Sequence, residues 1–67
     1  MKISARNQFA GTITAINEGA VNGIVTLKSD DTVITGTISM SAIKELGLEV
    51  GKEAVAIIKA TSVMFAA

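Results

Sequence analysis

Hydrophobic and β-branched residues alternate with polar ones over most of this chain, and this two-residue period restricts it to a fold built from β-strands. In the first run, threonines alternate with β-branched and aromatic residues. The last run carries valine and isoleucine on both faces, which is typical of a strand that is covered on both sides. The pattern predicts strands over Gln8–Asn17, Val21–Lys28, Thr32–Ile38 and Glu53–Ala60.

Turn-forming residues separate the first three runs. Glu18-Gly19-Ala20 predicts the first turn, and Ser29-Asp30-Asp31 predicts a hairpin because these side chains bond their own backbone in turns. Gly23 and Gly36 lie inside strand patterns, so each predicts a bulge or a close backbone approach. The alternation places four residues of the second run on one face, namely Val21, Gly23, Val25 and Leu27.

The hydrophobic period changes once, after the third run, to the spacing of a short helix. Ser39 is a suitable N-cap, and Gly47 is placed to take the left-handed conformation that ends a helix. Lys44 lies near the C-terminal end of this helix, where a positive charge is favourable. We therefore expect one or two turns of helix before the last strand.

This order of elements predicts an all-β protein, a five-stranded OB-like Greek-key barrel with one short helix between the third and fourth long strands. An SH3-like barrel is the less favoured alternative, and the first residues of the chain could supply or join a strand. With no internal repeat and no linker, residues 1–67 are expected to form a single domain.

The composition indicates that the core of this barrel is marginal. The chain has 67 residues, 49% of them hydrophobic, and neither cysteine nor histidine to supply a disulfide or an ordinary zinc site. Apolar residues on both faces of the last strand (Val55, Ile57 and Ile58) and in the tail Val63-Met64-Phe65 would leave apolar surface exposed on a monomer. A homo-oligomer is the natural way to cover it.

Several classes of function are disfavoured by the residues present. Without His or Cys, nucleophilic triads and thiolate chemistry are excluded, and Asp30-Asp31 is better explained as a turn than as a catalytic pair, so we expect no enzyme. A formal net charge of zero with no Trp or Tyr disfavours nucleic acid. We expect no signal peptide and no membrane-spanning segment, and a cytoplasmic location, since small secreted domains are more often rich in cysteine.

Groups suited to an oxyanion occur near both ends of the chain, in Ser4-Ala5-Arg6-Asn7 and Lys59-Ala60-Thr61-Ser62. Arg6 offers a planar fork of donors, Lys59 a compact positive charge, and the hydroxyl residues additional donors. The alternative is that Arg6 and Lys59 are solvated surface charges that form ion pairs with Glu18 or Glu53, in a structural or protein-interaction module with no small ligand.

Three segments of the sequence carry a resemblance to a known family. MKISARNQFAGTI, ITGTISMSAIKELGLEVGKEAVAIIKA and KATSVMFAA together cover essentially the whole chain and resemble the molbindins, the small molybdenum-pterin-binding proteins. The resemblance implies a Mop-type domain that assembles as a hexamer, a trimer of dimers, and binds molybdate or tungstate at subunit interfaces. It implies no catalytic cofactor and no directly coordinated metal cation. With so few aromatic residues, nothing in the sequence supports a pterin pocket.

The resemblance also assigns oxyanion-binding residues. Ser4 and Arg6 would come from one subunit, and Lys59, Ala60 and Thr61 from its neighbour. The segment that begins the helix would close the site with hydroxyl and backbone N–H groups, from Ser39, Ser41 and Ala42. Relatives often carry a hydroxyl residue where this chain has Ala42, so its backbone N–H or Ser41 would replace that contact. A second site is assigned loosely to Ala20, Val21 and Asn22.

Overall fold

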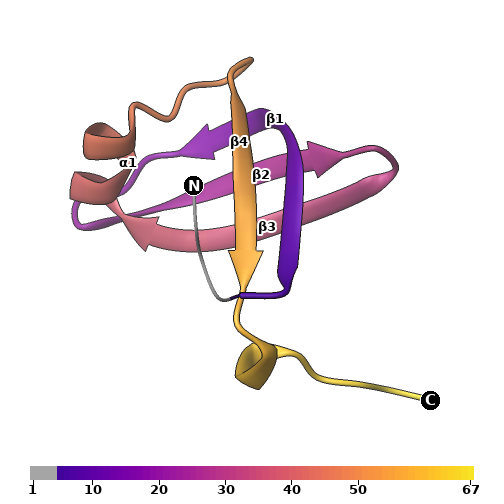
Figure 1. The fold of residues 1–67 in the computed structure, drawn as a ribbon. Helices are drawn as coiled ribbons and strands as arrows, with labels where there is room; N and C mark the ends of the chain where they lie inside the picture. The colour runs from indigo at the N-terminus through magenta and orange to yellow at the C-terminus, as the bar shows by residue number, and fades with distance from the viewer. Residues whose placement is uncertain (1–4) are drawn as a thin grey trace.

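The computed structural model describes residues 5–67, which form a curled antiparallel sheet with one short helix (Figure 1). The predicted strands and helix are all present in the expected order, and the all-β class is confirmed. The last strand ends at Ile58 rather than Ala60, because the next residues turn into a 3-10 helix. The elements are β1 (Asn7–Asn17), β2 (Asn22–Ser29), β3 (Thr32–Ser39), α1 (Met40–Leu46), β4 (Glu53–Ile58) and η1 (Ala60–Ser62).

The sheet has the strand order β3-β2-β1-β4, and its long first strand holds it together. Asn7 to Thr12 of β1 pair with β4, and Thr12 to Asn17 pair with β2. The register shifts by one residue between Ile13 and Ala15, which is a bulge at the place where β1 passes from one partner to the other. Figure 1 shows the result, with β4 lying across β2 and β3 rather than alongside them.

The prediction of five strands was wrong for the part of the chain that the structure describes, which has four. A bent strand of eleven residues takes the place of two shorter ones, because each half of β1 pairs with a different neighbour. The suggestion that the first residues supply a strand concerns residues 1–4, which lie outside the described range.

Both ends of the helix α1 are capped as predicted. The Ser39 hydroxyl accepts a hydrogen bond from the Ala42 N–H at 3.1 Å. Gly47 takes the left-handed conformation, with φ 65°, and the Leu48 N–H reaches back to the Ile43 carbonyl at 3.0 Å.

Among residues 5–67, the buried hydrophobic residues are Ile13, Leu27 and Ile43, and Ile13 is the most deeply buried of them. The close approach predicted at Gly23 is confirmed, since a Cβ there would lie 2.7 Å from Cδ1 of Ile43. The prediction at Gly36 was wrong, because the β2–β3 register is continuous there and a Cβ would meet nothing within 4 Å. Val21 does not share the buried face, because it precedes β2 and is 73% exposed.

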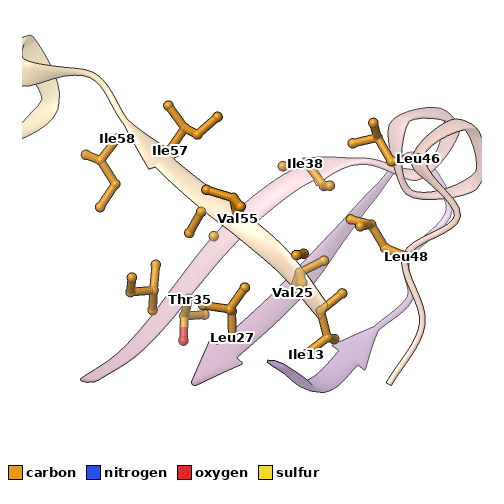
Figure 2. Close-up of a pocket in the computed structure, with 14 residues that line it drawn as sticks. Ile13, Val25, Leu27, Thr35, Ile38, Leu46, Leu48, Val55, Ile57 and Ile58 are labelled. Atoms are coloured by element: carbon orange, nitrogen blue, oxygen red, sulfur yellow. The ribbon is translucent and has the colours of Figure 1, made fainter. Parts of the chain in front are cut away.

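An apolar cavity of about 430 Å³ opens between β3 and β4, the two ends of the sheet order. Figure 2 shows hydrophobic side chains from both strands and from the end of α1 around it. Val55 and Ile57, which line it, remain 40% and 36% exposed in the isolated chain. In the tail, Met64 and Phe65 are more than 90% exposed. The apolar surface expected from the composition is therefore present on a single copy.

Candidate functional site

The basic residues from the two ends of the chain lie side by side in the fold. The last pair of the β1–β4 ladder is Asn7 opposite Ile58, and the next residue outward on each strand is Arg6 or Lys59. Figure 1 shows this end of the ladder at the foot of β4, where the chain enters η1. Residues at opposite ends of the sequence thus form one cluster, called the foot cluster below: Arg6, Lys59, Ala60 and Thr61.

The two positive charges of the foot cluster are available to a ligand. Arg6 and Lys59 are both exposed. The ion pair found among residues 5–67 joins Lys52 Nζ to Glu49 at 3.3 Å, elsewhere on the molecule. The pairs with Glu18 or Glu53 that the alternative interpretation requires are not formed within this range. Two adjacent cations that form no ion pair among residues 5–67 attract an anion.

The short helix η1 adds backbone donors to the same place. Its turn uses the N–H groups of Ser62 and Val63, which donate to the carbonyls of Lys59 at 2.9 Å and Ala60 at 3.4 Å. Within the described chain, the N–H groups of Ala60 and Thr61 have no hydrogen-bond acceptor. The foot cluster therefore combines two cations, a hydroxyl and two backbone N–H groups.

Two side-chain hydrogen bonds that the sequence analysis did not anticipate hold the segment around Arg6. Asn7 Nδ2 donates to the Ile58 carbonyl across the ladder at 3.2 Å, and Gln8 Nε2 donates to the Ala5 carbonyl at 2.6 Å. Both amides directly follow Arg6 in the sequence, but the residue types alone give no sign of which backbone groups they contact. Ser4, the remaining predicted member at this end, lies outside the described residues.

The predicted donors at the start of α1 form a second group, called the helix cluster below: Ser39, Ser41 and Ala42. Its hydrogen-bonding groups are mostly bonded to one another. The Met40 N–H donates to the Val21 carbonyl at 2.8 Å, the Ala42 N–H donates to Ser39 Oγ, and the Ser39 and Ser41 hydroxyls lie 3.2 Å apart. The backbone N–H of Ala42, a predicted oxyanion donor, is therefore already used by the N-cap.

The loosely assigned second site adjoins the helix cluster rather than the foot cluster. Asn22 lies opposite Ser39 in the β2–β3 ladder, and the Val21 carbonyl accepts the hydrogen bond that begins α1. Ala20, Val21 and Asn22 are all exposed. The predicted members of this region include no basic residue, so it offers polar groups but no charge of its own.

The foot cluster and the helix cluster lie apart within one chain. Figure 1 shows α1 at one side of the sheet and η1 beyond the foot of β4, well separated in the view. An oxyanion with a single metal centre cannot contact both clusters of the same copy. Residues 5–67 also contain no group of three or more acidic side chains that could hold a metal cation. The donors of both clusters fit an anion.

A curled OB-like sheet with an exposed cationic cluster defines a small domain whose charges suit an anion, and comparison with known proteins identifies its family. The TOBE domain matches residues 3–65. A probable molybdenum-pterin-binding protein of Haemophilus influenzae is 58% identical over 65 residues, which is 96% of this chain and 94% of that protein. The chain belongs to the TOBE domain family, and its resemblance to the molbindins is confirmed.

Solved structures agree with this assignment. MopII from Clostridium pasteurianum superposes with a TM-score of 0.93 at 39% identity, covering 98% of this chain and all of that one. The cytoplasmic molybdate-binding protein ModG, solved with molybdate bound, gives a TM-score of 0.90 at 45% identity. The matched region covers 96% of this chain and 46% of the ModG chain. The names of these relatives are those of binding proteins. No helix within residues 5–67 has the length and apolar character needed to cross a membrane.

Proposed function

We propose that this protein binds molybdate or tungstate reversibly as an intact oxyanion. The observation that carries the proposal is the placement of Arg6 beside Lys59, both exposed and neither paired with a carboxylate among the described residues. Two positive groups balance a dianion, and a hydrogen bond to a charged group contributes about 1.5–3 kcal/mol. ModG, which is 45% identical to this chain, has been solved with molybdate bound.

The oxyanion site is completed between copies of the chain. The foot cluster supplies charge, and the helix cluster of a neighbouring copy supplies hydroxyl groups and the Ser41 N–H. The separation of the two clusters within one chain supports this arrangement. The resemblance to the molbindins implies a different division, with Arg6 and Lys59 on different subunits, but their adjacency in the fold allows one copy to supply both.

The copies form a homo-oligomer, a hexamer built as a trimer of dimers by the resemblance to the molbindins. The apolar cavity between β3 and β4 and the exposed tail residues support association, because a monomer would leave them in contact with water. The site for a second oxyanion near Ala20, Val21 and Asn22 belongs to this proposal and would also require neighbouring copies to supply charge.

The biological role that fits best is storage or homeostasis of molybdenum by a single Mop-type domain in the cytoplasm, where its structural neighbour ModG acts. Neither catalysis nor binding to nucleic acid or membrane is part of this role. The alternative, a protein-interaction module without a small ligand, predicts no response to any oxyanion.

A thermal-shift panel followed by calorimetric titration tests the proposal. Molybdate and tungstate should each raise the melting temperature, since a ligand that binds only the folded state stabilises it by mass action. Sulfate and phosphate belong in the same panel, because smaller shifts with them would show selectivity for the larger oxyanions. The absence of saturable heat with molybdate up to millimolar concentration would refute the proposal and favour the interaction module.

A further inference from the structure

The backbone on either side of Arg6 is fixed by two side-chain hydrogen bonds, which come from the two residues that follow it. Asn7, which follows it, donates from Nδ2 to the Ile58 carbonyl on the opposite strand at 3.2 Å. Gln8 donates from Nε2 to the carbonyl of Ala5, which precedes Arg6, at 2.6 Å. We propose that Asn7 is a positioning residue that keeps Arg6 opposite Lys59, with Gln8 as a weaker support; this rests on the function proposed above.

The need for such a residue follows from the charges. Arg6 and Lys59 repel one another whenever no anion lies between them. They follow directly after the last pair of the β1–β4 ladder, where strands separate most easily. The Asn7 hydrogen bond crosses between the strands at that last pair and joins residues 51 positions apart in sequence. It therefore opposes the separation that the two charges would otherwise cause.

The two amides should not contribute equally. The Asn7 hydrogen bond is partly buried, whereas that of Gln8 is exposed. Water competes less for a buried bond, so its loss costs more. A binding site whose charges are already in place avoids the cost of ordering them when the ligand arrives. Asn7 should therefore affect oxyanion affinity without contacting the oxyanion.

The test substitution is Asn7→Leu, which keeps a similar side-chain volume and removes the donor. Ser29→Ala is the matched control, because Ser29 Oγ also bonds a β1 carbonyl, that of Ala10 at 2.6 Å, in a pair of strands away from the foot cluster. Both substitutions should lower the melting temperature. Molybdate affinity by calorimetry should fall about fivefold to tenfold in Asn7→Leu, the equivalent of one net hydrogen bond. It should stay within about twofold in Ser29→Ala, because that bond does not adjoin the foot cluster.

Equal affinities in the two variants would overturn the proposal, because they would show that Asn7 contributes only to stability. Amide hydrogen exchange of the ligand-free protein provides an independent measurement. In Asn7→Leu, protection of the Ile58 amide should fall about fivefold or more, while that of Leu27 in the core is unchanged. Unchanged protection of the Ile58 amide would also overturn it. If the unaltered protein fails to bind molybdate, the function proposed above fails, and the exchange measurement still decides the role of Asn7.

Discussion

The foot cluster and the helix cluster differ in what their hydrogen-bonding groups are already doing. At the foot of β4, Arg6 and Lys59 carry unpaired charge, and the N–H groups of Ala60 and Thr61 have no acceptor within the described chain. At the start of α1, by contrast, the Ala42 N–H is bonded to the Ser39 hydroxyl. The foot cluster therefore has groups that can bind a ligand, whereas those of the helix cluster are largely used to cap α1.

This difference assigns separate tasks to the two regions. Substitutions in the foot cluster should change oxyanion affinity and leave folding stability nearly unaltered, because they remove no internal bond. Substitutions in the helix cluster should change stability first and affinity second. A helix-cluster variant that loses much of its oxyanion affinity but keeps normal folding stability would contradict this assignment.

The largest effect is expected where assembly itself is disturbed, since under the proposed function neither cluster forms a complete site alone. Phe65 is 95% exposed in the single chain. Covering such a side chain contributes about 1.5–3 kcal/mol, and Phe65→Asp removes that contribution and adds a charge. Native mass spectrometry at low micromolar concentration, with and without molybdate, should show an oligomer for the unaltered chain in both conditions and a shift to smaller species for the variant.

Two results would contradict this expectation. A monomeric variant that binds molybdate with full affinity would show that the foot cluster needs no partner. An unaltered chain that is monomeric without ligand and assembles only with molybdate would show that the apolar surface is not what drives association.

The next largest effect is expected from Arg6→Lys, which keeps the charge but loses the planar fork of donors. Oxyanion affinity should fall by about 1–3 kcal/mol, in line with losing a charge-assisted hydrogen bond. The melting temperature of the ligand-free protein should not change. Lys28→Ala, which removes an exposed charge from β2, measures separately how far a change in net charge alone alters the affinity. Affinity within twofold of the unaltered protein would place Arg6 outside the site.

The fold elements that sequence predicted well are those set by local chemistry. The cap at Ser39, the left-handed Gly47 and the close approach at Gly23 each depend on one residue type in one local setting. The strand count failed because it depends on pairing: β1 is one continuous run in sequence and has two partners in space. Nothing in a single strand's alternation reveals where it changes partner.

The candidate site, like the fold, could be predicted where it depends on single residues and not where it depends on strand pairing. The residue types that suit an oxyanion could be identified from the sequence, because charge and donor chemistry belong to individual residues. Their grouping could not, because the adjacency of Arg6 and Lys59 is created by the β1–β4 register. The occupied N–H of Ala42, by contrast, follows from the predicted N-cap, because a capping serine hydroxyl accepts from the backbone N–H two or three residues further on.

A moderate effect on stability, rather than on binding, is expected from Ser39→Ala. The substitution removes the hydroxyl that caps α1 and should lower the free energy of unfolding by about 1 kcal/mol. Ser41→Ala is the matched control in the same turn, because its hydroxyl contacts only Ser39 within the described chain and alanine favours the helix. Chemical denaturation should separate the two variants. Equal stabilities would mean that the cap contributes nothing.

The smallest effect, and the sharpest test of whether the helix cluster reaches the oxyanion, is expected from Ala42→Ser. The backbone N–H of Ala42 is already used, so a new hydroxyl is the simplest way for this position to supply a donor. If a neighbouring copy presents this turn to the foot cluster, molybdate affinity should rise by about 0.5–1 kcal/mol, the value of one additional hydrogen bond. Stability should fall slightly, because serine is a poorer helix former than alanine. Calorimetry on the assembled protein measures both the gain and its enthalpy. An intact oligomer with unchanged affinity would show that the helix cluster only supports the fold, and would leave the foot cluster to bind the anion without it.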